Sequence, residues 1–489
     1  MRNALVDALT AGALTALLGG ALAAGPALAA SAPGANTAAP PAQTGTAPPA
    51  PAAPGGQEAT GTAAPSGGEQ WWNVHGQNTD IVQGDAGFPA KYSGPNSLSP
   101  RSQTQHTVTA DLYAGARLSP GTEAHLDFQM WQGFGLQGTL GVENFPDADA
   151  YKLGTASPNF TFARLFVRRT IGLGGEKEDV ADGPLTLAGR QDVRRVTITA
   201  GRFAMTDIFD LNSYAGDPHT QFMSWGLVAN LAWDYAADAV GFTTGVSVEY
   251  NQPKWTLRYG VFQMPAVPNS FTAEDQLLMY PARGADGPPL RSWSMTSEYE
   301  RRYNVRSHPG VVRLLAFLNQ ARMARYQDEV ALLNAGADPT AARAYRDRYG
   351  FGLNWEQEVA GGVGVFSRLG WNDGQEEPWN YTDVNVTGSL GVSVNGARWH
   401  RPGDTVGLAG VVSGASGANQ AFLKAGGTGI LDGDGALNYG PESVVETYYN
   451  AALWKTVQGA LDYQFVSNPA FNQDRGPVSI FGVRLHASF

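Results

Sequence analysis

The fold is decided by the last twelve residues of the chain, Val478-Ser479-Ile480-Phe481-Gly482-Val483-Arg484-Leu485-His486-Ala487-Ser488-Phe489. Counting back from Phe489, every second residue is apolar or small, and the residues between them include Arg484 and His486. Because successive side chains of a strand point to opposite faces, this pattern predicts a strand with one apolar and one polar face. A final strand ending on Phe is typical of bacterial outer-membrane β-barrels, which present it to the barrel-insertion machinery. That machinery is therefore an expected partner of Phe489.

The N-terminal region indicates export from the cytoplasm. Arg2 precedes an apolar stretch from Ala8 to Ala24, and Ala27-Leu28-Ala29 matches a small-x-small cleavage site. This order of features is that of a secretory signal peptide. We therefore predict that residues 1–29 are a signal peptide.

Residues 30–70 differ in composition from the rest of the chain. Between residues 31 and 70 there are eight prolines among many Ala, Thr and Gly residues, and only Glu58 and Glu69 are charged. Such a segment cannot bury a core, so we predict a disordered linker in the periplasm. The remaining residues, 71–489, are predicted to form one outer-membrane β-barrel domain.

The overall composition excludes several classes of protein. Beyond the N-terminal region the chain has no run of about 20 apolar residues, so no spanning helix is expected. The net charge of −11 argues against a nucleic-acid partner. Cysteine is absent, which excludes disulfides, thiolate nucleophiles and Cys-ligated metals.

The region after residue 70 divides into sixteen segments in which apolar and polar residues alternate. Short turns rich in Pro and Gly join several of them into hairpins, as between segments 106–118 and 123–130 and between segments 242–250 and 255–262. The connections are alternately short and long, as expected for short periplasmic turns and long extracellular loops. The exception is connection 173–194, which is long on the turn side. The sequence predicts an all-β, transmembrane antiparallel β-barrel of about 16 strands in the bacterial outer membrane.

The cost of burying charge in lipid predicts which face of each strand lines the lumen. An Arg side chain at mid-membrane costs roughly 2–4 kcal/mol, and Asp or Glu somewhat less. The polar faces should therefore point inward and the apolar faces should contact outer-membrane lipid. This rule, applied outside the fourth strand, predicts the following lumen-facing residues on the solute pathway: Arg117, Asp127, Glu249, Arg258, Glu298, Arg313, Asn354, Glu356, Arg368, Asp462 and Arg484. They carry both signs of charge, so strong selectivity for anions or cations is not indicated.

The fourth strand suggests a track for sugars. Alternation places Phe160, Phe162, Arg164, Phe166 and Arg168 on one face, and the cost of Arg in lipid turns this face inward. Aromatic rings stack on the apolar faces of sugars, and guanidinium groups bridge neighbouring hydroxyls. The alternative is that the Phe residues contact lipid and the Arg residues lie near the interfaces.

Two long connections are candidates for a constriction. Residues 321–348 have helical character and could form a surface helix or fold inward. Residues 206–241 contain Asp207, Asp210, Trp225 and Trp233 and could also narrow the lumen. The segment Asp432-Gly433-Asp434-Gly435 has part of a calcium-loop pattern, but without the following ligands it is interpreted as a polar turn.

From Trp71 to Phe489 the chain resembles the carbohydrate-selective porins of the outer membrane, the OprB-type family. The resemblance rests on Gln132-Gly133-Phe134-Gly135-Leu136, Ala163-Arg164-Leu165-Phe166, Asp207-Ile208-Phe209-Asp210, Thr220-Gln221-Phe222-Met223, Tyr349-Gly350-Phe351-Gly352-Leu353-Asn354, Arg368-Leu369-Gly370-Trp371-Asn372-Asp373-Gly374, Asp404-Thr405-Val406-Gly407-Leu408, Asn438-Tyr439-Gly440-Pro441-Glu442 and Asp474-Arg475-Gly476-Pro477-Val478. It implies a sixteen-stranded porin that conducts glucose and related small saccharides by facilitated diffusion, without a cofactor. Carbohydrate solutes are thus the expected partners, and a homo-oligomer is possible.

Other functions remain alternatives. The chain could be a general diffusion porin, or a structural outer-membrane protein whose linker contacts peptidoglycan. Neither His-Glu-x-x-His nor Gly-x-Ser-x-Gly occurs, and the seven His residues are scattered, so an enzyme is not expected.

Overall fold

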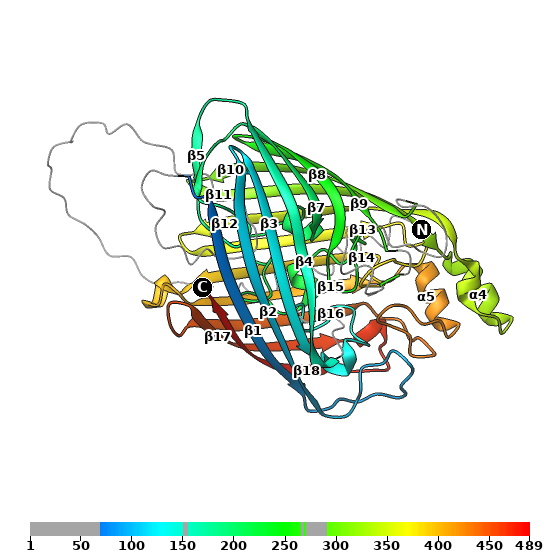
Figure 1. The fold of residues 1–489 in the computed structure, drawn as a ribbon. Helices are drawn as coiled ribbons and strands as arrows, with labels where there is room; N and C mark the ends of the chain where they lie inside the picture. Colours follow the sequence, from blue (N-terminus) through cyan, green and yellow to red (C-terminus); the bar gives the residue numbers. More distant parts are fainter. Residues whose placement is uncertain (1–68, 150–154, 266–267, 270–290) are drawn as a thin grey trace, which may run out of the picture. The chain divides into compact units, whose positions relative to one another are not determined.

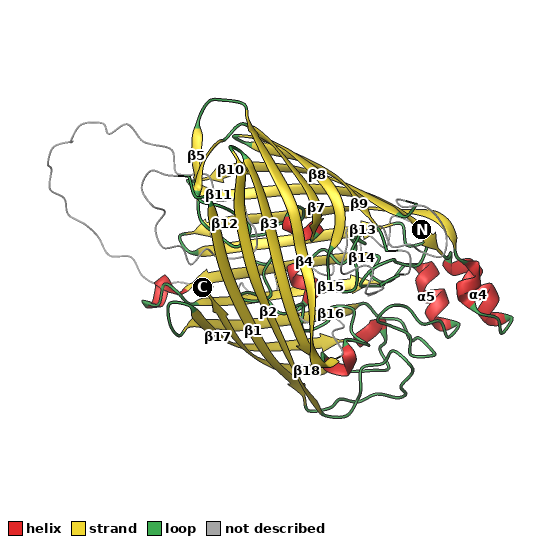
Figure 2. Cartoon of the chain, viewed as in Figure 1, coloured by secondary structure: helices red, strands yellow, loops and turns green. Residues whose placement is uncertain are grey.

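The computed structural model describes residues 69–149, 155–265, 268–269 and 291–489. The predicted signal peptide and all but the last two residues of the predicted linker lie outside the described residues. Within them, sixteen strands form one closed antiparallel barrel, which confirms the predicted fold (Figures 1 and 2). No helix among the described residues is long and apolar enough to cross a membrane.

The barrel strands follow the chain around the ring. Their bounds are β1 (Trp72–Asp85), β2 (Gln103–Ser119), β3 (Thr122–Gly133), β4 (Thr155–Gly172), β7 (Arg195–Phe203), β8 (Thr243–Gln252), β9 (Trp255–Gln263), β10 (Trp293–Val305), β11 (His308–Met323), β12 (Ala344–Ala360), β13 (Val363–Asn372), β14 (Val386–Asn395), β15 (Thr405–Gly414), β16 (Glu442–Ala452), β17 (Val457–Ser467) and β18 (Val478–Ser488). Within the described part of the chain, three α-helices lie in the long loops: α2 (Trp225–Val228), α4 (Tyr326–Asn334) and α5 (Gly417–Lys424).

The C-terminal strand closes the ring. β18 pairs with β17 on one side and with β1 on the other, and Gly76 and Phe489 exchange two backbone N–H···O bonds of 2.9 Å. Along β18, Phe481 is exposed on the outside whereas Arg484 is buried inside. The period-two pattern therefore has the predicted structural meaning, and closure leaves no unpaired edge in the hydrocarbon.

The exceptional connection 173–194 contains a separate two-stranded sheet. This sheet pairs β5 (Lys177–Val180) with β6 (Gly189–Asp192) and does not join the barrel. Between them, Ala188 exchanges hydrogen bonds with Gln70, immediately before β1. The long connection on the turn side is thus an ordered hairpin added at the start of the barrel.

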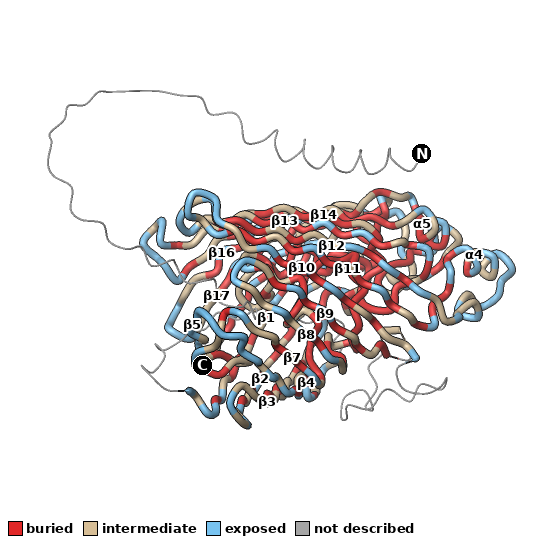
Figure 3. Tube along the Cα trace, turned by 90° about the horizontal axis from the view of Figure 1, so that it is seen from above, coloured by how far each residue is buried: buried red, intermediate tan, exposed pale blue. Residues whose placement is uncertain are grey.

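Of the two candidate constriction loops, one lies outside the barrel and the other lies inside it. The loop between β11 and β12 forms α4, which packs beside α5 at the long-loop end (Figure 1) and is largely exposed in Figure 3. The loop between β7 and β8, residues 204–242, is mostly buried and bonds to inward-facing side chains of several strands. It therefore lies inside the barrel and narrows the lumen.

The inward loop brings a hydrophobic core into the barrel. Phe209 and Trp233 from this loop pack with Phe145 of the β3–β4 loop, Phe262 of β9 and Trp379 of the β13–β14 loop. The interior is consequently more filled than sixteen strands alone would suggest.

Candidate solute pathway

Asp210 is the main anchor of the inward loop. Its carboxylate lies 3.0 Å from Nε of Arg368 on β13 and accepts a 2.7 Å hydrogen bond from Nδ2 of Asn354 on β12. Its backbone N–H donates to Glu298 on β10 at 2.8 Å. Arg368 also donates to the carbonyl of Leu227 at 2.8 Å. Three predicted lumen-facing residues thus hold the loop against the wall.

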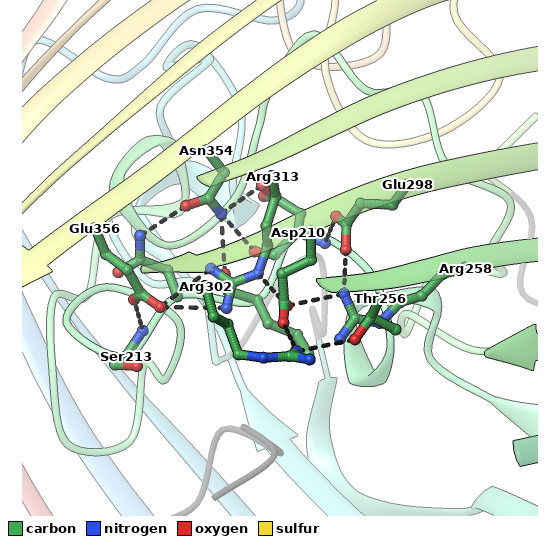
Figure 4. A network of polar contacts seen from close by, with 12 residues as sticks. Asp210, Ser213, Thr256, Arg258, Glu298, Arg302, Arg313, Asn354 and Glu356 are labelled. Carbon is green, nitrogen blue, oxygen red and sulfur yellow. Dashed lines mark hydrogen bonds and ion pairs between the residues drawn. The ribbon is translucent and has the colours of Figure 1, made fainter. Parts of the chain in front are cut away.

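A network of ion pairs extends from this anchor along the wall (Figure 4). Arg258 lies 2.9 Å from Glu249, 2.7 Å from Glu298 and 3.0 Å from Glu300. Arg313 joins Glu300 at 2.9 Å. This wall therefore carries buried charges of both signs, each next to its opposite.

The same network continues into the inward loop. Glu356 lies 3.1 Å from Arg313 and accepts a 2.5 Å hydrogen bond from the backbone N–H of Ser213. The charged wall from β8 to β12 thereby fixes the position of the loop.

The far side of the loop is held by β16 and β18. Arg484 donates to the carbonyls of Pro218 and Gln221 at 2.6 and 2.9 Å. Glu446 accepts hydrogen bonds from the backbone N–H groups of Met223 and Ser224. Asp462, also inward and buried, accepts a 3.0 Å hydrogen bond from Gln464.

Arg164 on β4 is held from two sides. It lies 2.6 Å from Asp127 of β3 and forms a two-pronged contact of 2.8 Å per prong with Asp207 at the start of the inward loop. Its guanidinium group also lies 5.0 Å from the ring centre of Phe242. The arrangement is rigid, since both carboxylates fix one planar group.

Phe162 is the one predicted pathway residue that points outward. Asp127 pairs with Arg164 but Phe128 pairs with Phe162, so Ala163 is an extra residue in β4 and forms a β-bulge. The alternation therefore slips by one residue at this point. Phe162, like Phe160, is exposed on the outside and packs on Phe128, with ring centres 5.4 Å apart. The prediction that Phe162 lines the lumen is wrong.

The remaining predicted residues of β4 and β2 point inward near the turn side. Phe166 is buried, and its ring stacks on His125 with centres 5.2 Å apart, so it has little free face for a sugar. Arg168 donates to the carbonyl of Leu185 at 2.8 Å. Arg117 lies 3.2 Å from Glu123.

Sequence reasoning missed the partners of the predicted residues. Asp207 and Asp210 were placed in a candidate constriction loop, but their pairing with Arg164 and Arg368 was not predicted. The nearest signal was the Asp207-Ile208-Phe209-Asp210 motif. Glu446 lies on an alternating strand and could have been found by the same parity rule as its neighbours.

The wall that carries Arg313 on β11 and Arg368 on β13 differs in solvent access from the wall that carries Arg164 on β4. The side chains of Arg164 and Asp207 keep 15% and 18% of their surface accessible, whereas those of Arg368 and Arg313 keep only 1% and 3%. The inward loop therefore covers the wall around β13 and leaves the wall around β4 accessible. Arg164 and Asp207 are therefore charged groups that a solute could contact, and Glu249 and Arg302, on β8 and β10, also keep 24% and 18% of their side-chain surface accessible.

Comparison with known proteins agrees with this architecture. The model of the carbohydrate-selective porin, OprB family, matches residues 95–489. The high-pH structure of Pseudomonas putida OprB is similar in fold, with 15% identity, a TM-score of 0.65 and coverage of 86% of this chain and 94% of that chain. Acinetobacter baumannii DcaP, an outer membrane channel, gives 9% identity, a TM-score of 0.45 and coverage of 86% and 97%. No curated protein sequence matches the chain.

The family match covers most of the chain, and the barrel and its inward loop are those of a channel rather than an enzyme. The protein belongs to the OprB family of carbohydrate-selective porins of the Gram-negative outer membrane.

Proposed function

We propose that this porin passes glucose and related small saccharides by facilitated diffusion along the β3–β4 side of its lumen, past Arg164 and Asp207. The observation that carries this proposal is the contrast in solvent access between Arg164 and the covered Arg368. A solute can contact only charged groups that retain accessible surface.

The chemistry of this wall suits a neutral, hydroxyl-rich solute. Arg164 is paired with Asp127 and Asp207, so the wall offers hydrogen-bond donors and acceptors side by side. Sugar hydroxyls both donate and accept, and they can bridge a guanidinium group and a carboxylate. An anion gains less from Arg164, because its guanidinium group already pairs with two carboxylates.

The aromatic part of the predicted sugar track has no support. Phe160 and Phe162 point outward, and Phe166 is buried against His125. Selectivity in this proposal therefore rests on the polar groups that narrow the lumen.

Further partners follow from the outer surface. The apolar side chains exposed on the outside, such as Leu112 of β2 and Phe481 of β18, support contact with outer-membrane lipid. Phe489 is largely exposed and remains a proposed contact of the insertion machinery. The proposal includes no enzymatic activity.

Liposome swelling tests the proposal. Liposomes that carry the protein should swell faster in glucose or another monosaccharide than in a zwitterion of similar size. Equal rates would make the protein a general diffusion porin, which is the second candidate function.

A further inference from the structure

Three carboxylates from three long loops meet at the extracellular end. They belong to Glu143 between β3 and β4, Asp383 between β13 and β14, and Asp432 between β15 and β16. One carboxylate oxygen from each lies within 4.8 Å of the others, and all three residues are buried. None of the proposed pathway contacts involves them.

Two of these carboxylates have oxygens without a hydrogen-bond donor. Neither oxygen of Asp432 accepts a hydrogen bond, nor does Oε1 of Glu143. Neither residue forms an ion pair with another residue that the structure describes. Glu143 and Asp432 are fully buried, so a negative charge on either side chain is costly unless a cation or a proton compensates it.

The neighbouring Glu442 is a buried carboxylate in this region whose two oxygens both accept hydrogen bonds. Its oxygens accept four hydrogen bonds, two from the backbone and side chain of Asn144, one from the backbone of Glu143 and one from the backbone of Ala470. Asp434 is likewise held, by Asn472 at 2.9 Å and by the nearby guanidinium of Arg475. Among the buried carboxylates that the structure describes, Asp432 stands apart because both of its side-chain oxygens lack a donor.

The backbone brings the three carboxylates together. The N–H of Asp383 donates to Oε2 of Glu143 at 2.7 Å, and the N–H of Ile430 donates to Oδ2 of Asp383 at 2.7 Å. A Cβ atom on Gly429 would lie 2.3 Å from Asp432 and 2.6 Å from Asp383, so this position has no room for a side chain. The three loops thus form a cradle of oxygens with Gly429 at its edge.

Burial and the closeness of the three carboxylates both disfavour negative charge in this cradle. Burial, followed by the charges of Asp383 and Asp432, raises the pKa of Glu143 well above its usual range. Burial and the charges of Asp383 and Asp434 also raise the pKa of Asp432. The backbone N–H of Gly429 lowers this pKa, but by less. A bound proton or a bound cation would relieve this repulsion.

We propose that Glu143, Asp383 and Asp432 bind a calcium ion that holds the three extracellular loops together. Ca²⁺ takes six to eight oxygen ligands in a flexible geometry, and carboxylates bind it through one or both oxygens. The cradle offers only oxygen ligands, which favours a hard cation over zinc or copper. In this proposal Asp432 of the segment Asp432-Gly433-Asp434-Gly435 supplies a ligand, whereas Asp434 contacts Asn472 and Arg475.

Calcium titration of the purified full chain tests the site. The protein is solubilised in detergent, freed of metal with EDTA and titrated with CaCl₂ in a calorimeter. Asp432→Asn and Glu143→Gln should each weaken calcium binding by about tenfold or more, because each removes a charged ligand. The matched control Asp328→Asn, at an exposed carboxylate of α4, should bind as the unaltered protein does.

Each other outcome contradicts the proposal. Equal calcium binding by all four proteins would place the ion elsewhere, and absence of binding at millimolar calcium would mean that protons neutralise the cradle. Tighter binding of Mg²⁺ than of Ca²⁺ would overturn the assignment of the ion.

The thermal midpoint of unfolding distinguishes a variant that has lost calcium binding from one that does not fold properly. In EDTA, Asp432→Asn should unfold at the same temperature as the unaltered protein or higher, because it removes one of the repelling charges. Added calcium should raise the midpoint of the unaltered protein and of Asp328→Asn, and it should raise that of Asp432→Asn less at the same concentration. A variant that is unstable in EDTA as well would show that Asp432 serves the apo fold and not an ion.

Discussion

The wall around β13 and the wall around β4 obey the same rule of alternation but end in different environments. Arg368 on β13 points inward and is covered by the inward loop, which it holds through Asp210 and Leu227. Arg164 on β4 also points inward, yet it remains partly accessible. Parity along a strand therefore decides which residues face the lumen, whereas the loop decides which of them meet solvent.

Loss of the Arg368 side chain should have the largest effect. Arg368→Ala leaves the buried carboxylate of Asp210 without its cation, a change that typically costs about 3–5 kcal/mol. We expect a lower thermal midpoint, higher single-channel conductance in planar bilayers and weaker sugar-induced block, because the loop is released from the wall. Arg190→Ala, at an exposed position of β6, serves as the control and should change none of these three quantities. Unaltered conductance in Arg368→Ala would show that the loop does not narrow the lumen.

Loss of Arg164 should act on solutes more than on the loop. Arg164→Ala removes the only ion-pair partner that the structure describes for Asp127, and it leaves the accessible wall without its guanidinium group. Sugar-induced block of the current should weaken by about tenfold, the worth of one charged hydrogen bond. Titration of the current with a panel of sugars measures this change. If block is unaltered, the solute pathway does not pass β4.

The loop between β11 and β12, which stays outside the lumen, should differ from the two walls in that its stability depends on pH. Burial, and then the charge of Glu377, raises the pKa of Glu329 on α4 to about 8, against 4.5 for a free side chain. Between these values the folded state holds a proton that the unfolded state has lost, so the stability of α4 should fall as pH rises from about 4.5 to 8.

Hydrogen exchange of the α4 amides, corrected for the intrinsic rate, measures this pH effect. Exchange should be faster at pH 9 than at pH 6 in the unaltered protein, and Glu329→Gln should remove the difference. Conductance should not change, since α4 lies outside the lumen. Equal exchange at both pH values in the unaltered protein would show that Glu329 is not held neutral.

The smallest effect is expected at the outward-facing Phe162. Phe162→Ala removes a ring contact worth about 0.5–1.5 kcal/mol beyond its buried area. The free energy of unfolding in lipid should fall by this order, while sugar-induced block should stay the same. A change in block comparable to that of Arg164→Ala would mean that the bulge at Ala163 does not turn Phe162 outward.

Most of the barrel could be predicted from the sequence because the alternation within each strand shows which face is apolar and which is polar. Apolar residues such as Phe481 and charged residues such as Arg484 alternate, and lipid imposes a large cost on the wrong face. The rule of alternation gave the wrong face for Phe162, because one extra residue at Ala163 shifts the alternation. A bulge inserts a residue without changing composition, so the local pattern does not reveal it.

The site was harder to predict than the strands. Asp210 and Arg368 are 158 residues apart in the sequence, and neither strand parity nor composition pairs them. The inward position of their loop depends on many such contacts made at once. The sequence showed only that two loops were long enough to enter the lumen.

Thiol accessibility on the two walls tests the central claim most directly. The chain has no cysteine, so Gln129→Cys on β3 and Ser389→Cys on β14 each provide a single reactive group. Gln129 is half-buried beside Asp111, whereas Ser389 is buried next to Arg368. A charged, water-soluble thiol reagent should modify the cysteine at 129 and reduce the current, and it should leave the cysteine at 389 unmodified. Fast modification at 389 with none at 129 would contradict the assignment of the covered and the accessible wall.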